Sequence, residues 1–127
     1  MPNTIARAAL FADAAIAPIG APLVEVVAVA KKDLRAGEEI DELGGYIVYG
    51  VAENAEVAAR EDLLPIGIAP GCRLKRDLPK DTPLTYADVE VPAGRICDAL
   101  RREQMQHFFP DLDTRAGSLP QAASAIA

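Results

Sequence analysis

The chain carries one pattern twice, first as AKKDLRAGEEI at residues 30–40 and again as LKRDLPKDTPL at residues 74–84. Each copy runs from an apolar residue through a basic pair and Asp-Leu to a short turn, and then returns to an apolar residue. We expect Leu34 and Leu78 to fill the core just before the chain reverses. At the turn, Gly37 adopts a left-handed φ without steric cost, and Asp81 tolerates one in the second copy.

This repetition has two interpretations. Short strand–turn–strand units can come to look alike by chance, or the chain contains an internal duplication. The duplication predicts two hooks, the first at residues 30–40 and the second at residues 74–84, that are related by a pseudo-twofold axis. Such hooks would clasp one another and share a single core. Because only two copies exist, the pattern does not indicate a solenoid.

The segments around the hooks are short. β-branched and aromatic residues predict extended segments at residues 24–31, 46–51, 72–76 and 84–91. Asn54 is a candidate N-cap for a short helix that ends near Arg60. Brief strands separated by Gly and Pro turns are typical of a compact, mainly-β domain.

The two ends of the chain have a different character. We expect a helical stub and Pro/Gly connector at residues 1–22, the β domain at residues 23–92, a C-terminal helix at residues 93–109 and a flexible tail at residues 110–127. The first helix presents only Ile5 and small alanines on its apolar face. It therefore resembles a segment that packs against something outside this β domain.

Composition limits the class of partner. The 127 residues include thirteen basic and nineteen acidic side chains, for a net charge of −6, which repels nucleic acid. The apolar run at residues 21–30 is short and contains Glu25, so we expect no membrane span. Cys72 and Cys97 form no disulfide framework and favour a reduced, cytoplasmic setting.

The motifs of cofactor binding and catalysis are missing. No two glycines stand two residues apart, which excludes the dinucleotide fingerprint, and Val51 occupies the lysine position of a phosphate loop that would begin at Gly45. A single histidine, His107, provides no metal-ligand pair. We expect Cys97 to be a small buried apolar residue. The sequence therefore predicts no catalytic residue, no metal site and no cofactor bound by this chain.

One polar constellation recurs, formed by the basic pairs of the two hooks. The candidate binding residues are Lys31, Lys32, Lys75 and Arg76. One interpretation is a site for an anion or a sugar acid across the pseudo-twofold axis. The other is that these side chains discourage strand addition at an edge and form local ion pairs with their acidic neighbours.

At these residues the chain resembles the SAF domain, the β-clip fold of type III antifreeze proteins, which also occurs in sialic acid synthases. The resemblance is carried by residues 29–38, 64–69, 74–78 and 83–89. It implies a mainly-β, pseudo-twofold β-clip of short strands between an N-terminal helical stub and a C-terminal helix. Sialic acid synthases place an arginine shortly before this region in a neighbouring active site, whereas this chain has Val26, so that role is not carried over.

A narrower resemblance covers residues 5–11 and 44–50, which are similar to the end of homoserine-dehydrogenase-like oxidoreductases, a group with a branch that resembles reductoisomerases of deoxyxylulose phosphate. It implies a non-catalytic C-terminal accessory domain. Its partner would be an oxidoreductase domain, on the same or a separate chain, that binds NAD or NADP and acts on a small polar, possibly phosphorylated, carbohydrate-derived substrate. The alternative is a stand-alone domain that binds sugar acids or other carbohydrates. Homo-oligomers through the terminal helices are a further expectation.

Overall fold

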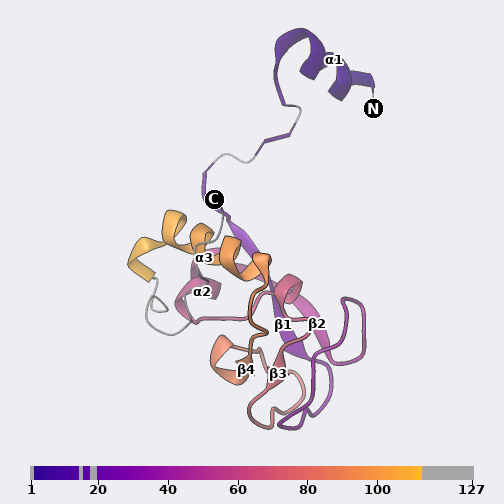
Figure 1. Cartoon of the computed structure of the whole chain (residues 1–127), viewed down its shortest axis with the longest axis vertical. Coiled ribbons are helices and arrows are strands. Elements are labelled where there is room, and N and C mark those ends of the chain that lie inside the picture. Colours follow the sequence, from indigo (N-terminus) through magenta and orange to yellow (C-terminus); the bar gives the residue numbers. More distant parts are fainter. Residues whose placement is uncertain (1, 15, 18–19, 113–127) are drawn as a thin grey trace.

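The structure is a computed structural model that describes residues 2–14, 16–17 and 20–112. Its helices are α1 (Pro2–Phe11), α2 (Ala55–Arg60) and α3 (Ile96–Phe108), with short 3-10 turns at η1 (Ile66–Ile68), η2 (Tyr86–Asp88) and η3 (Pro110–Leu112). Its strands are β1 (Val24–Ala30), β2 (Val48–Asn54), β3 (Arg73–Leu74) and β4 (Val89–Glu90). β1 pairs antiparallel with β2, and β3 pairs antiparallel with β4. Figure 1 shows α1 standing clear of the body that contains the other elements.

The two hooks clasp one another as the repeat predicts. The N–H of Leu34 donates to the carbonyl of Leu78 (2.8 Å), and the N–H of Leu78 donates back to the carbonyl of Leu34 (3.0 Å). Both leucine side chains are 1% exposed. The predicted core role of these leucines is therefore confirmed, and each hook completes the backbone hydrogen bonding of the other.

Further hydrogen bonds repeat at the same sequence offset. The N–H of Gly37 donates to the carbonyl of Leu74, and the equivalent N–H of Asp81 donates to the carbonyl of Ala30, each at 2.8 Å. The φ angles of Gly37 and Asp81 are 87° and 62°, so both turn residues adopt the predicted left-handed conformation. The paired bonds relate the two hooks by an approximate twofold, as an internal duplication requires.

Side-chain caps follow the same relationship. The carboxylate of Asp33 accepts a hydrogen bond from the backbone N–H of Lys80 (2.9 Å). The carboxylate of Asp77 accepts one from the backbone N–H of Ala36 (2.8 Å). Each hook thus uses its aspartate to satisfy a turn N–H of the other hook, which explains why Asp precedes Leu in both copies.

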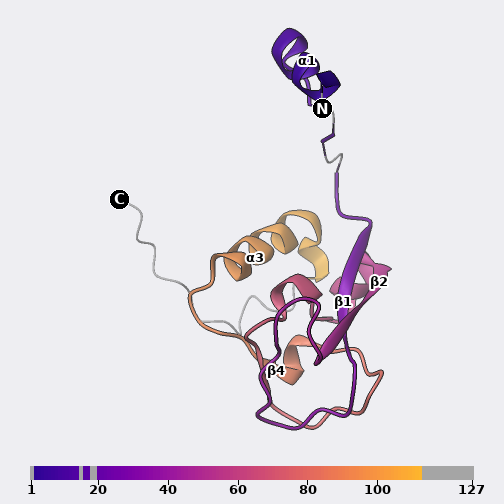
Figure 2. The same ribbon diagram turned by 90° about the vertical axis from the view of Figure 1, so that its right-hand side faces the viewer.

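The core lies between the hooks and the ribbon that β1 and β2 form. Its most completely buried large side chains come from both hooks and from the segments beside them, and include Leu34, Ile40, Leu64, Leu78, Leu84 and Val89. Leu63 and Leu64 are buried in the core, whereas η1, which follows them, contains no buried residue. In Figure 2, β2 lies on the outer side of β1, away from α3.

The expectation of a mainly-β chain holds only in part. Short antiparallel strands are present, but they contain 7, 7, 2 and 2 residues, whereas the three α-helices contain 10, 6 and 13. The segment predicted to be extended at residues 84–91 includes the 3-10 turn η2, because the Thr85 and Asp88 side chains form a capping box there. Similarly, η3 continues the chain at residues 110–112, and the rest of the predicted flexible tail, residues 113–127, lies outside the described residues.

Candidate functional site

The four candidate binding residues lie on the hooks, and three of them have local partners. Lys31 Nζ lies 3.1 Å from the Gly45 carbonyl oxygen and 5.7 Å from the ring centroid of Tyr46. Lys32 Nζ lies 3.3 Å from Glu38 Oε2. Arg76 Nε donates to Asp88 Oδ1 at 2.5 Å. Lys75 is exposed, and no ion pair joins it to any of the described residues.

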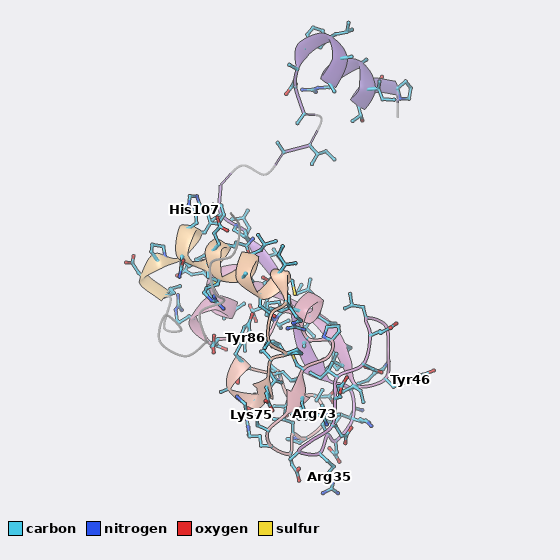
Figure 3. All side chains as sticks on the ribbon, viewed as in Figure 1. Arg35, Tyr46, Arg73, Lys75, Tyr86 and His107 are labelled. Carbon is cyan, nitrogen blue, oxygen red and sulfur yellow. The ribbon has the colours of Figure 1, made fainter. Side chains whose placement is uncertain are left out.

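The two basic pairs do not converge on one point. Tyr46, which lies under the Lys31 ammonium group, is on the opposite side of the body from Lys75 in Figure 3. Binding of an anion by any of the four residues remains a prediction, and a shared site across the approximate twofold lacks geometric support.

Asp88 is the buried charged side chain of the described core, at 2% exposure. Besides Arg76 Nε, it accepts hydrogen bonds from the Thr85 backbone N–H (2.9 Å) and hydroxyl (2.8 Å). Burial alone would raise the pKa of this carboxyl group, but the bonds from Arg76 and Thr85 outweigh burial and lower the pKa below its usual 3.8. A carboxylate held ionised in this way fixes η2 to the second hook and has little capacity for proton transfer.

The cysteines differ from each other. Cys72 is fully buried, and burial raises the pKa of its thiol, although the Arg95 guanidinium 3.7 Å from Sγ acts in the opposite direction. Cys97 was expected to be buried, and this is wrong because the N-terminal turn of α3 directs it to the exposed side. A buried thiol with a raised pKa is a packing residue, and the exposed one has no base beside it among the contacts of the described residues.

Arg95 and Arg101 hold α3 against the body, and sequence reasoning missed both. Arg95 forms a bidentate pair with Asp98 and donates to the carbonyl oxygens of Pro70 (2.7 Å) and Ile68 (3.0 Å). Arg101 Nη1 lies 2.6 Å from the carboxylate of Glu25 on β1. The i, i+3 spacing of Arg95 and Asp98 could have predicted their ion pair from the sequence. The hydrogen bonds from Arg95 to the carbonyls of Ile68 and Pro70 have no such sequence signal, because these residues are distant in the chain.

Arg73 makes a similar link between β3 and the first hook. Its guanidinium donates to the carbonyl of Gly37 (2.8 Å) and to the carboxylate of Glu39 (2.9 Å). Arg35, at the tip of the first hook, lies 3.6 Å from the carboxylate of Asp77 in the second. These arginines thus hold segments of the body together.

Large apolar side chains are exposed at the ends of the described chain. In α1 no residue is buried, and Ile5, Leu10 and Phe11 are 67–74% exposed. Others project from the start of β1 and from α3, namely Leu23, Val24, Ile96 and Leu100. Such surfaces are typical of protein–protein contacts.

The described residues contain neither a metal-binding cluster nor a membrane-spanning helix. No group of three or more His, Cys, Asp or Glu side chains in that part of the chain could hold a metal ion. None of the helices found there is long and apolar enough to cross a membrane. His107 lies in the last turn of α3, where its ring meets that of Phe108 edge to face at 4.6 Å.

Comparison with known families identifies the family of the chain. A family model described as the SAF domain matches residues 25–90, just over half of the chain. No curated protein matches the sequence. The matched range contains both hooks, β2, β3, β4 and all of β1 except Val24, and it ends before α3.

Proposed function

The chain belongs to the SAF domain family, and from this premise we propose that it is a non-catalytic accessory domain that assembles with the catalytic region of an NAD(P)-dependent oxidoreductase. The catalytic region, on the same or a separate chain, would supply the NAD or NADP site. Its substrate would be a small polar, possibly phosphorylated, carbohydrate-derived molecule. The observation that carries this proposal is the exposure of every residue of α1.

An isolated helix of this length is marginal in water, because its few backbone hydrogen bonds do not offset the cost of ordering. α1 contains 10 residues and buries none of them in the described body. A partner surface that covers Ile5, Leu10 and Phe11 would provide the missing apolar contacts. The resemblance of residues 5–11 to the end of homoserine-dehydrogenase-like enzymes supports the proposal that this partner surface belongs to the catalytic region of such an enzyme.

The body itself has the properties of a rigid adaptor. We propose that it is a β-clip, supported by the reciprocal bonds of Leu34 and Leu78 and by the capping carboxylates of Asp33 and Asp77. Its buried carboxylate, Asp88, is neutralised by Arg76. Because these polar and charged groups are paired within the domain, the domain presents a fixed surface to a partner.

Co-expression tests the proposal. The tagged chain is expressed with a homoserine-dehydrogenase-like catalytic domain from the same genome, and we expect the two to purify together. Replacing Leu10 by Asp should abolish capture, because it removes an apolar side chain from α1. Thr4→Asp is the matched control, since it adds the same charge to the exposed helix and removes no large apolar group. Failure of the two domains to associate, or equal capture of both variants, would defeat the proposal.

The second candidate is a stand-alone domain that binds sugar acids. It is favoured by the Lys31 ammonium group beside the ring of Tyr46, which is 82% exposed, because a sugar ring can stack on an aromatic face while a cation holds its carboxylate. Titration of sugar acids followed by amide chemical shifts separates the candidates. Shifts confined to residues 31–32 and 44–47 would support the stand-alone binding domain. Unchanged spectra would argue against sugar-acid binding and favour the accessory role.

A further inference from the structure

β2 has one edge without a partner strand. The N–H of Ala55 donates to the carbonyl of Leu23 (3.0 Å), which fixes which residues of the ribbon exchange hydrogen bonds. Because these residues alternate along an antiparallel pair, Val48, Gly50 and Ala52 direct their N–H and C=O groups away from β1. Among the described residues, no strand or isolated bridge pairs with that side of β2.

The other edge of the ribbon, on β1, is hydrogen-bonded to other segments of the body at Ala28 and Ala30. The N–H of Ala28 donates to the carbonyl of Leu64 (2.8 Å), and its carbonyl accepts from the N–H of Leu84 (2.9 Å). The N–H of Ala30 donates to the carbonyl of Thr82 (2.9 Å). Within the part of the chain that the structure describes, β2 therefore forms the open side of this sheet, and it lies on the outside of the body (Figure 1, Figure 2).

The sequence of β2 does not protect this edge. Residues 48–54 read VYGVAEN, with no lysine, arginine or proline among them. Gly50 and Ala52 are exposed, and Val51 is 40% exposed. Edge strands that avoid further pairing are usually short, charged or interrupted, whereas β2 is 7 residues long and regular. A two-stranded ribbon also gains stability when further strands are added.

We infer that β2 pairs antiparallel with β2 of a second copy of this chain, across a twofold axis at Val51, so that two ribbons form one four-stranded sheet. The inference does not depend on the proposed function. In this register Gly50 exchanges hydrogen bonds with Ala52 of the second copy, and all seven residues of each strand are paired.

Charge favours the same register. Glu53 is the charged residue of β2, and here it lies opposite Tyr49 of the second copy and not opposite another carboxylate. β2 can thus pair with a second copy of itself along its whole length without placing two carboxylates opposite each other.

The mass of the full 127-residue chain, followed by light scattering at increasing concentration, tests the pairing. We expect a dimer for the native chain and a monomer for Val51→Lys, because the variant places two like-charged side chains directly opposite each other across the axis, with their Cβ atoms about 5 Å apart. Val24→Lys is the matched control, since Val24 is exposed on β1 and adds the same charge away from the β2 edge. This control should remain dimeric.

Cross-linking gives a readout that does not depend on affinity alone. Across the axis, Val51 forms a non-hydrogen-bonded pair with Cα atoms about 4.5 Å apart, which is within disulfide range. Val51→Cys in a Cys97→Ser background, oxidised with glutathione disulfide, should give a covalent dimer, and Val24→Cys in the same background should not. A single-chain mass at every concentration, a dimer that survives Val51→Lys, or the absence of the cross-link would overturn the inference.

Discussion

Single residues set the geometry of the hooks through backbone conformation. Gly37 has a φ of 87°, and a Cβ atom added there would meet nothing within 4 Å. Gly37→Ala should therefore destabilise the fold by about 1–2 kcal/mol, the cost of a left-handed φ for a residue with a Cβ atom. Gly67→Ala is the matched control, because Gly67 has equal space and no positive φ. Urea unfolding measures both, and an equal effect of the two changes would contradict the argument.

A second residue-scale prediction concerns the charge of Asp88. Its pKa in the folded chain is lower than the usual 3.8, so its ionisation stabilises the fold above that pH. This contribution declines as the pH falls through the lower, folded-state pKa. Asp88→Asn should lose about 1–3 kcal/mol at neutral pH, because hydrogen bonds to a charged acceptor are replaced by weaker ones.

The pH dependence separates this explanation from a simple packing defect. The difference between Asp88→Asn and the native chain, measured by urea unfolding from pH 7 to pH 2, should be constant near neutrality. It should shrink below about pH 4, where Asp88 takes up a proton in the unfolded chain, and the charge contribution should be lost once the pH falls through the lower pKa of the folded chain. A difference that stays the same down to pH 2 would show that the carboxylate charge has no role.

At the scale of elements, α3 is attached mainly by polar contacts, since Met105 is its buried residue in the described structure. Arg95→Met removes the donors to the Ile68 and Pro70 carbonyls and should increase the hydrogen exchange rates of α3 amides by about 10- to 100-fold, equivalent to about 1–3 kcal/mol. Arg102→Met is the matched control on the same helix. Amides of the hooks should keep their protection in both variants, and unchanged exchange of α3 in Arg95→Met would refute this role.

The elements also show which structure a sequence can predict. Asn54 was identified as a helix N-cap, and its side chain does accept the N–H of Glu56 at 3.0 Å, because capping depends on residues close in sequence. The extended segments predicted at residues 72–76 and 84–91 contain β3 and β4, but the pairing of these strands was not predicted, since two residues in each carry no periodic signal. The ion pair between Arg101 and Glu25 could not be predicted from the sequence either, because it depends on how α3 packs against β1. The structure was needed to show that Lys31, which lies beside Tyr46, and Lys75 are on different sides of the body.

For the whole molecule, the reciprocal bonds imply that the two hooks form one cooperative unit. Neither hook can open alone, because each supplies the acceptors for the N–H groups of the other, such as Leu34 and Leu78. Their amides should therefore exchange through a single opening with a common free energy, whereas the amides of α1, which is fully exposed, should exchange much faster.

A substitution in one hook should then weaken the other hook equally. Leu78→Val removes one methylene from a side chain that is 1% exposed, which costs about 1 kcal/mol. Native-state hydrogen exchange should show this loss at Leu34 and Gly37 in the first hook to the same extent as at Asp81 in the second, because one opening event exposes all of these amides. If the first hook kept its native protection while the second lost it, the hooks would be separate folding units. The hydrogen bonds between the hooks would then not make their unfolding cooperative.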